Sequence, residues 1–347
     1  MLTLRAAALA ALVALAGSAP ARAQWTYVPS GTSAELRGLS AVSDRIVWAS
    51  GSRGAFLRSG DGGRTWTTDT VPGAAALDLR AVHGFSGAAA VVASAGEADK
   101  GLARIFATTN GGRSWDLVYS TDQKGVFLDA IAFWDARNGV ALSDPVGGAF
   151  FLLLTSDGGR TWARIPPERL PPVLPGEAAF AASGSSLVVQ GSSRLWIGTG
   201  GSGRARVMHS PDRGRTWFVT DAPVHAEGGA AGIFSLAFYD ACRGVAAGGD
   251  YTKPRLHARS VALTYDGGRT WHAAKTPPTA YLSGVSYAGA ASRLVAVGLA
   301  GSFVSRDSGQ TWTPMDTIAM NSVRFSGKSG WAVGPRGRVA HLDSVAP

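Results

Sequence analysis

The sequence predicts an all-β protein, a seven-bladed β-propeller with four-stranded antiparallel blades whose ring is closed by the N-terminal strand. Three observations lead to this fold class. An octapeptide of the pattern Ser/Thr-x-Asp-x-Gly-x-Thr-Trp returns six times along the chain. Its tryptophans lie about 41 to 55 residues apart, a period typical of one propeller blade. Short apolar strands separate the copies, and the last repeat is one strand short.

Residues 1–23 have the features of an export signal that precedes the fold. Arg5 supplies a basic start, residues 6–16 form an apolar stretch too short to span a bilayer, and residues 21–23 fit a cleavage site before Gln24. We therefore expect an exported protein, periplasmic or secreted, with no transmembrane segment after signal removal. Residues 24–347 are expected to form a single propeller domain that is monomeric.

Each octapeptide, called a box below, has the composition of a tight hairpin turn. In the first copy the carboxylate of Asp61 can accept backbone N–H bonds across the bend, and the glycines after it can take positive φ. Trp66 then opens the next strand as an apolar anchor. The residues interpreted as structural are Asp61, Asn110, Asp157, Asp212, Asp266 and Asp307, with Trp66, Trp115, Trp162, Trp217, Trp271 and Trp312.

Calcium binding is the functional alternative for the boxes, because Asp-x-x-Gly runs also occur in calcium loops. Each box has one carboxylate where a calcium loop supplies several oxygen ligands, and Asn110 brings no charge. The six histidines show no metal-ligand spacing, so we predict no metal and no cofactor. The single Cys242 excludes an internal disulfide and is expected to be a small core residue.

The formal net charge of +9 is a moderate excess, and part of it is repetitive. One box position holds Arg64, Arg113, Arg160, Arg215 and Arg269, which are expected to ring one edge of the propeller as solvated charges. Nucleic-acid binding would need a concentrated basic stripe with stacking aromatics, so no nucleic-acid partner is predicted. An anionic partner such as a membrane surface, a polysaccharide or an acidic protein patch stays open.

Between the boxes, each repeat begins with an inner strand and continues with a strand rich in small residues. Apolar alternation places the inner strands at 36–42, 79–85, 128–134, 177–182, 234–239, 282–287 and 321–325. The seventh repeat has three strands before the chain ends. Because Trp25 and Thr26 repeat the start of a strand that follows a box, residues 24–29 are predicted to complete the seventh blade.

Surplus length is concentrated in residues 163–176, 221–232 and 251–259. In a four-stranded blade, the connections that leave the second and fourth strands emerge on the face opposite the box turns. All three segments are such connections, around blades three to five. Loops on a rigid scaffold frequently carry function, so the functional face is predicted to be the one opposite the boxes.

Polar residues at the starts of inner strands and the ends of second strands are expected to meet at the mouth of the central channel. The candidates for partner or ligand binding are Arg37, Arg80, Asp129, Asp144, Glu177, Asp250 and Tyr251, with Lys253 and Arg255 as a charged rim. Ser235, Ser283 and Asn321 take the same place in other repeats. Such a cluster could bind a charged ligand, perform acid–base chemistry or merely line a hydrated channel. No residue is assigned as catalytic.

The boxes resemble the Asp-box, or BNR, repeat of sialidases, xyloglucan-active endoglucanases, sortilin-type receptors and photosystem II stability and assembly factors. In these families the box is structural and lies away from the active face. The resemblance covers nearly all of residues 24–347 and implies the sialidase-superfamily propeller fold, while it leaves the activity open. Residues 164–166 are the only trace of the sialidase Phe-Arg-Ile-Pro motif, and Ala163 replaces its Phe, so sialidase activity is not expected.

Among these families the chain is most similar to the photosystem II assembly factor-like propellers, in length, export signal, short blades and lack of a catalytic signature. That resemblance implies an exported scaffold that binds or assembles other proteins through its loop-rich face. One alternative is a polysaccharide-active glycoside hydrolase, which needs two suitably spaced carboxylates, drawn from Asp129, Asp144, Glu177 and Asp250. The other is an oxidoreductase-labelled propeller, although no cofactor site is visible among the residues.

Overall fold

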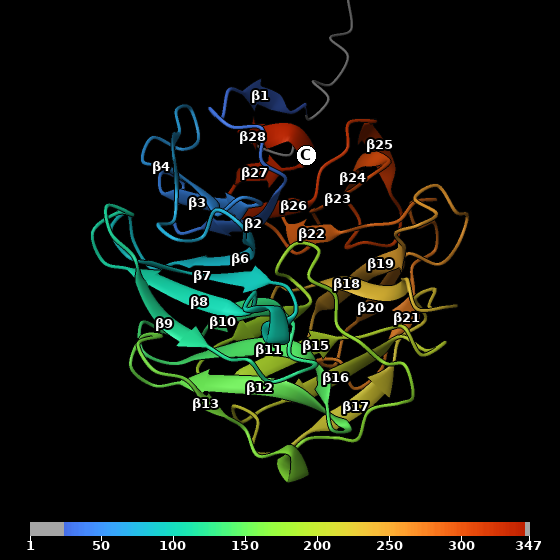
Figure 1. Ribbon diagram of the computed structural model, residues 1–347. Helices are drawn as coiled ribbons and strands as arrows, with labels where there is room; N and C mark the ends of the chain where they lie inside the picture. The colour runs from blue at the N-terminus through green and yellow to red at the C-terminus, as the bar shows by residue number, and fades with distance from the viewer. Residues whose placement is uncertain (1–23, 344–347) are drawn as a thin grey trace, which may run out of the picture.

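A computed structural model describes residues 24–343 and shows seven four-stranded antiparallel sheets arranged as blades around a central axis (Figure 1). The predicted all-β, seven-bladed fold is therefore confirmed. The export signal predicted at residues 1–23 lies outside the described residues. Within residues 24–343, no helix has the length and apolar character needed to cross a membrane.

Each blade runs from an inner strand beside the axis to an outer strand at the rim. Blade one contains β2 (Leu36–Ala41), β3 (Val47–Gly51), β4 (Ala55–Ser59) and β5 (Thr67–Thr70). Blade two contains β6 (Asp78–Gly84), β7 (Ala90–Ala95), β8 (Arg104–Thr108) and β9 (Asp116–Ser120). Blade three contains β10 (Leu128–Phe133), β11 (Gly139–Val146), β12 (Ala149–Thr155) and β13 (Ala163–Arg164).

The remaining blades follow the same order. Blade four contains β14 (Leu187–Gln190), β15 (Arg194–Gly198), β16 (Arg206–Ser210) and β17 (Phe218–Asp221). Blade five contains β18 (Ala231–Phe238), β19 (Gly244–Asp250), β20 (Val261–Thr264) and β21 (His272–Ala273). Blade six contains β22 (Gly284–Tyr287), β23 (Leu294–Gly298), β24 (Gly301–Ser305) and β25 (Thr313–Asp316). The short 3-10 helices η1 (Ala98–Lys100), η2 (Pro167–Arg169) and η3 (Pro335–Gly337) lie in connections.

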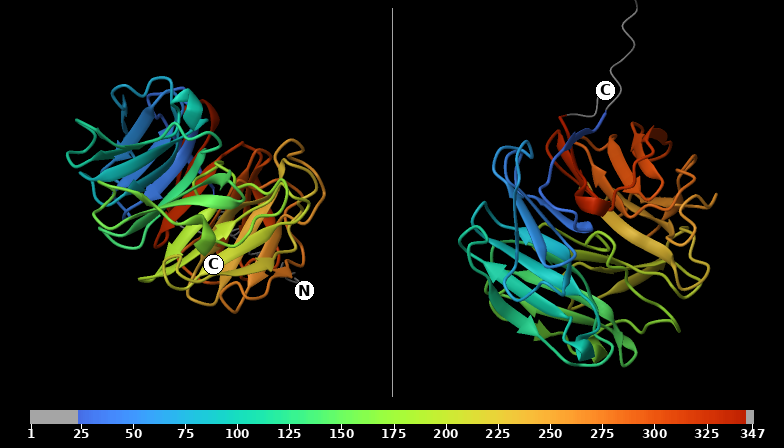
Figure 2. Two further views of the ribbon diagram at one scale, coloured as in Figure 1. Left: turned by 60° about the horizontal axis from the view of Figure 1, so that its bottom comes forward. Right: turned by 45° about the horizontal axis from the view of Figure 1, so that its top comes forward.

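Blade seven joins the two ends of the chain. It contains β26 (Ser322–Ser326), β27 (Ser329–Val333), β28 (Val339–Leu342) and the N-terminal β1 (Thr26–Val28), which pairs antiparallel with β28. The right view in Figure 2 places the blue start of the described chain beside its red end. Trp25 is buried in the apolar core of this seam, and its indole Nε1 donates to Ser302 Oγ at 3.0 Å. The predicted closure of the ring is confirmed.

Two of the box turns, those of blades one and five, each contact a buried tryptophan of the preceding blade. Trp331 of β27 is fully buried, and its Nε1 donates to the carbonyl oxygen of Gly62 in the box of blade one at 2.9 Å. At Gly63 a Cβ atom would lie 2.5 Å from that same Nε1, and φ is +83°. Only a glycine combines this conformation with this close approach. Trp196 of β15 contacts the box of blade five in the same way, donating to Gly267 O at 2.8 Å.

Within each box the Asp side chain, or Asn110 in the second copy, organises the turn. Asp157 Oδ1 accepts the backbone N–H of Thr161 at 3.0 Å, and Oδ2 accepts the Thr161 hydroxyl at 2.6 Å. These bonds, led by the hydroxyl, lower the pKa of Asp157 to about 2. In the second box Asn110 makes the equivalent bonds, accepting from the backbone N of Ser114 and donating from Nδ2 to its hydroxyl.

Two predictions from the sequence are wrong. The inner strand of blade four is β14 (Leu187–Gln190), and residues 177–182 do not form a strand. Cys242 is exposed and not a core residue, because it lies in the polar turn between β18 and β19, where its backbone N–H donates to Asp240 Oδ1.

Candidate functional site

Residues 177–186, called the channel segment below, enter the central channel ahead of β14. Figure 1 shows this yellow-green stretch near the middle of the ring. The segment is hydrogen-bonded to every other blade, in order around the ring through Arg37, Arg80, Asp144, Ser235, Ser283 and Ser322. The segment divides the channel into two hollows.

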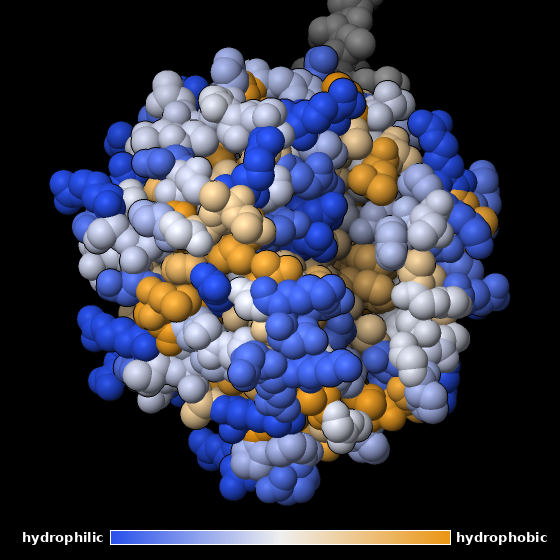
Figure 3. Space-filling model, viewed as in Figure 1, coloured by the Kyte–Doolittle hydropathy of each residue, from blue (hydrophilic) through white to orange (hydrophobic). Residues whose placement is uncertain are grey.

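The hollow on the side away from the box turns is called the mouth pocket. Its volume is about 400 Å³. Its lining includes Arg37, Arg80, Phe127, Asp129, Asp144, Phe180, Phe234, Tyr251, Tyr281, Leu299 and Asn321. In the space-filling view this face is hollowed near its centre, with hydrophobic residues in the depth and hydrophilic residues around them (Figure 3).

β-bulges aim inner-strand residues into the mouth pocket. In β2, β6, β10 and β18 the pairing register with the second strand shifts by one residue near the start of the strand. The residues left between the paired positions are Arg37, Arg80, Asp129 and Phe234. All four line the pocket, as expected for a bulge, which redirects the extra side chain out of the sheet pattern.

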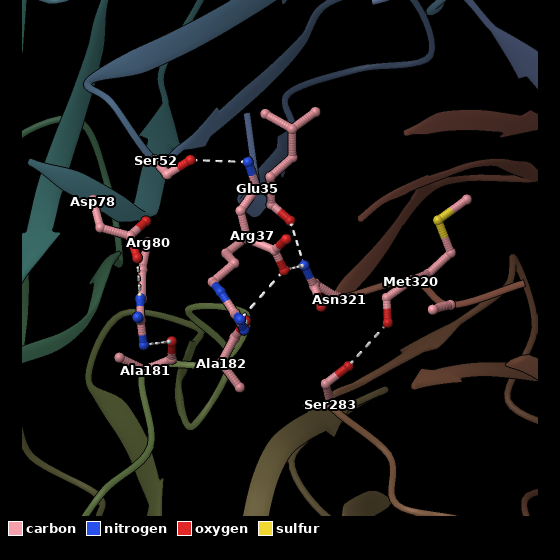
Figure 4. Close-up of polar contacts among 12 residues, drawn as sticks. Glu35, Arg37, Ser52, Asp78, Arg80, Ala181, Ala182, Ser283, Met320 and Asn321 are labelled. Carbon is pink, nitrogen blue, oxygen red and sulfur yellow. Dashed lines mark hydrogen bonds and ion pairs between the residues drawn. The ribbon is translucent and has the colours of Figure 1, made fainter. Parts of the chain in front are cut away.

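Arg37 and Arg80 join the wall of the pocket to its floor. Arg80 Nε lies 2.7 Å from Asp78 Oδ2, and Arg37 Nη2 lies 3.3 Å from Glu35 Oε1. Both guanidinium groups also donate to the channel segment, Arg37 to Ala182 O at 3.3 Å and Arg80 to Ala181 O at 3.4 Å (Figure 4). The two arginines therefore hold the segment, while Glu35 and Asp78 balance their charges.

Asp129 and Asp144 form an electrostatically coupled pair of carboxyl groups in the pocket. Burial raises the pKa of Asp129 well above its usual value; the charge of Asp144 adds to this effect, and Arg80 opposes it. Burial also raises the pKa of Asp144 to about 6, although the backbone N–H of Ala179 donates to its Oδ1 at 3.0 Å. The pair therefore holds protons more strongly than free aspartates do.

Three buried polar atoms of the pocket residues have no hydrogen-bond partner in the described part of the protein. They are Arg37 Nε, Asp129 Oδ2 and Asn321 Oδ1. Asn321 is itself held in place, since its Nδ2 donates to Glu35 Oε1 at 2.8 Å and to Leu36 O at 2.9 Å (Figure 4). A buried polar atom left without a partner costs about 1–3 kcal/mol, so these atoms favour a ligand that supplies both donors and acceptors.

Aromatic side chains form the opposite wall. Phe180 of the channel segment stacks on Phe234 with ring centroids 3.9 Å apart, and Tyr281 meets Phe234 edge-on at 4.8 Å. Tyr251 lies against the same cluster and is about half exposed. Aromatic clusters of this kind supply large apolar contact area for side chains of a partner.

The other residues singled out from the sequence lie outside the pocket lining. The fully buried Glu177 side chain forms an ion pair with Arg206 and accepts the Thr199 hydroxyl at 2.6 Å, so Glu177 anchors the root of the channel segment. Asp250 is buried at the end of β19 and lies 3.5 Å from Lys253 Nζ. Lys253 and Arg255 are exposed in the following loop, whereas Arg37, Arg80, Asp129, Asp144 and Tyr251 meet in the pocket.

Comparison with known proteins adds to this geometry. Among solved structures, the chain is similar to "YCF48 bound to D1 peptide", with a TM-score of 0.66 and 15% identity over 97% of this chain and 100% of the other. It is also similar to YCF48 from Cyanidioschyzon merolae, with a TM-score of 0.63 and 16% identity over 92% of this chain and 99% of the other. No family model and no curated protein matched the chain.

This similarity establishes the fold. The resemblance to photosystem II assembly factor-like propellers drawn from the boxes is thereby confirmed at the level of architecture. At 15–16% identity the similarity does not transfer the partner of YCF48 to this chain.

Sequence reasoning identified Tyr251 but missed Phe180, Phe234 and Tyr281 of the aromatic wall. Phe180 stood inside an expected strand, and Phe234 lies one position before Ser235, to which the repeat alignment assigned the channel position. Ser235 instead supports the channel segment, accepting the Ser185 hydroxyl at 2.8 Å. The available signal was Phe234, a large aromatic residue at the bulge position where other repeats have Arg or Asp.

Metal binding finds no support in side-chain clustering. Among residues 24–343, no group of three or more His, Cys, Asp or Glu side chains could hold a metal ion. The box carboxylates are engaged by their own turns, as Asp157 illustrates. The absence of a cofactor remains a prediction from the sequence.

Proposed function

We propose that this chain is an exported, monomeric scaffold that binds a peptide segment of another protein at the mouth pocket. The observation that carries the proposal is Asp129, whose buried Oδ2 has no partner among the described residues. Arg37 and Asn321, which line the same pocket, also have unpartnered atoms. A rigid propeller that holds such groups around a hollow is prepared for a ligand, because the cost of orienting them is already met in the fold.

A peptide matches this set of groups better than a ligand of one polarity. Arg37 offers a donor, Asp129 and Asn321 offer oxygens, and the aromatic wall of Phe180, Phe234 and Tyr281 offers apolar area. A peptide supplies N–H and C=O groups from its backbone and apolar groups from its side chains. The similarity in fold to a YCF48 structure with a bound peptide supports this class of ligand.

The exposed Lys253 and Arg255 extend the pocket into a basic rim. Rim charges mainly accelerate association and make it sensitive to salt. We therefore propose that the partner carries acidic residues next to the segment that enters the pocket. Nucleic acid is not part of the proposal.

The test begins with affinity capture of the partner from an extract of the protein's own host, followed by binding measurements on a synthetic peptide of that partner. The double variant Lys253→Glu with Arg255→Glu should slow association about tenfold and remove most of its salt dependence. Asp129→Asn keeps the shape of the side chain and should accelerate dissociation. The loop variant should fold normally, because exposed charges contribute little to stability. Asp129→Asn should also fold normally, because burial already disfavours the charged form of Asp129 and the amide keeps the shape of the carboxyl group.

The matched control is Arg64→Glu with Arg160→Glu, which reverses two exposed charges on the box face. Binding to this control should equal that of the wild type. Loss of binding in the control together with unchanged binding in the loop variant would place the functional face on the wrong side of the ring.

A second function is favoured by one observation, the coupling of Asp129 and Asp144. Two carboxyl groups with raised pKa values in one pocket can act as an acid and a base in polysaccharide hydrolysis. This alternative requires release of reducing sugar from a polysaccharide by the wild type and its loss in Asp129→Asn. Binding of a peptide without any such release would leave the scaffold as the function.

A further inference from the structure

The second hollow of the channel lies on the other side of the channel segment, toward the box turns. Its volume is about 420 Å³, and Ser183 and Gly184 line it where Ala181 and Ala182 line the mouth pocket. We call it the box-side cavity. The mouth pocket and the box-side cavity therefore present different residues of the same segment.

One charged residue stands out at a single level of this cavity. Strand register identifies the equivalent inner-strand position in each blade, and Arg324 of β26 occupies it in blade seven. The other six residues at this level are Ser40, His83, Ala132, Val188, Ala237 and Ser286. All seven line the cavity.

The guanidinium of Arg324 has no counter-ion among the described residues. It forms no ion pair there, and its one hydrogen bond runs from Nη1 to the carbonyl oxygen of Val323 at 3.0 Å. Burial lowers the pKa of Arg324 to about 10, so it stays charged at neutral pH. His83 adds no second charge there, because burial lowers its pKa to about 4.

Apolar side chains form part of the walls around this cation, and polar atoms form the rest. Val82, Ile131 and Leu236 line the cavity together with Phe133 and Phe325. Ser40 Oγ accepts the backbone N–H of Gly84 at 3.0 Å, which leaves its hydroxyl hydrogen available as a donor. A single cation, a hydroxyl donor and an apolar part of the wall suit an anion of one charge attached to a small apolar body.

We propose that the box-side cavity binds a small organic monocarboxylate, with its carboxylate on Arg324 and its apolar body against the inner strands. A guanidinium group matches a carboxylate through two parallel N–H···O bonds, and the weak screening in a cavity strengthens that pairing. Inorganic phosphate fits less well, because its second charge has no second cation at this level of the channel. This site is independent of the peptide site at the mouth.

The experiment is calorimetric titration of the whole mature chain with benzoate, octanoate, benzamide and inorganic phosphate. Benzoate or octanoate should bind at least tenfold more tightly than benzamide, which has the shape of benzoate without its charge, and tighter than phosphate. Arg324→Met should abolish the preference for benzoate over benzamide. Arg160→Met, which removes an exposed cation from a box turn, should leave it unchanged.

The benzoate and benzamide comparison uses the wild type alone, so the proposal stays testable if Arg324→Met does not fold. Absence of binding by both carboxylates at 10 mM (about 2.7 kcal/mol of binding free energy) overturns the proposal. Equal binding of benzoate and benzamide also overturns it, as do stronger phosphate binding and carboxylate binding that survives in a folded Arg324→Met variant.

Discussion

The two ends of the central channel are built from the same inner strands but differ in electrostatic design. At the mouth, two arginines, Arg37 and Arg80, and two carboxyl groups, Asp129 and Asp144, line one hollow. In the box-side cavity Arg324 is the one charged side chain at its level of the ring. The difference shows that a repeated backbone does not impose repeated chemistry, because equivalent positions in the seven blades carry different side chains.

The channel segment is what keeps these two ends apart. It crosses the axis between them, and its root is fixed by the buried ion pair of Glu177 with Arg206. The arginines of the mouth hold its far side through Ala181 and Ala182. Changes to the segment should therefore have larger effects than changes to either hollow.

The largest effect is expected from Glu177→Ala. It leaves Arg206 without its partner in a buried site, which typically costs about 3–5 kcal/mol of unfolding free energy. Urea unfolding measures this loss. The control is Glu97→Ala, which breaks an exposed pair with Lys100 and should change the free energy of unfolding very little. Equal losses in the two variants would show that the root of the segment is not anchored by this pair.

The second-largest effect is expected from acidification, which should destabilise the protein through His83 in the box-side cavity. Burial lowers the pKa of His83 to about 4, so the folded state holds the imidazole neutral. The stability of the folded state is therefore fully present above pH ~6.5 and falls as the pH drops toward 4, because the unfolded chain binds the proton more readily. Relative to His83→Phe, the wild type should lose about 2 kcal/mol between pH 7 and pH 5. Urea midpoints of both proteins at the two pH values measure it, and parallel behaviour would contradict the burial of His83.

At the mouth the same acidification should act in the opposite direction, with a smaller effect. The pKa of Asp144 is raised to about 6, so the folded state binds a proton on this carboxyl group more readily than the unfolded chain does. The stability gained in this way is greatest below pH ~4 and is lost as the pH rises through 6. Between pH 7 and pH 5 the wild type should therefore gain about 1 kcal/mol relative to Asp144→Asn. A relative loss in the same urea experiment would mean that Asp144 is stabilised in its charged form.

The smallest effect, close to zero, is expected from calcium. The box carboxylates, such as Asp157 and Asp61, already accept hydrogen bonds within their own turns. Asp129 has an unpartnered oxygen, but it is a single carboxyl group. Millimolar calcium or EDTA should leave the melting temperature within about 1 °C of its starting value, which corresponds to a fraction of 1 kcal/mol. A calcium-dependent rise of several degrees would make the boxes metal sites.

Periodic features were predictable from the sequence, and singular features were not. The boxes repeat in chemistry and spacing, and the Trp25 start repeats the strand that follows a box, so the blades and their closure follow from local pattern. Residues 177–182 were predicted as an inner strand because they are largely apolar. In the structure they belong to the channel segment, which enters the central channel ahead of β14 and is bonded to other blades there. A local sequence pattern does not reveal that an apolar segment lies in the central channel instead of forming a strand of a blade.

The bulges explain the errors within the site. A bulge inserts one residue into the register, so aligning repeats by sequence gave Ser235 where the channel residue is Phe234. Arg37, Arg80 and Asp129 were identified because polar residues stand out in a strand. Arg324 escaped notice because a lone arginine in an alternating strand looks like an ordinary exposed residue until the register places it on the axis.

The contacts of the channel segment also have a consequence for how the ring comes apart. Its six partners extend along the chain from Arg37 to Ser322, so these bonds join parts of the polypeptide that only the finished ring brings together. Such bonds cannot form during the making of any single blade, and the loss of any one blade deprives the segment of support. The segment thus links all the blades to one another, and the seven blades should unfold in one cooperative transition.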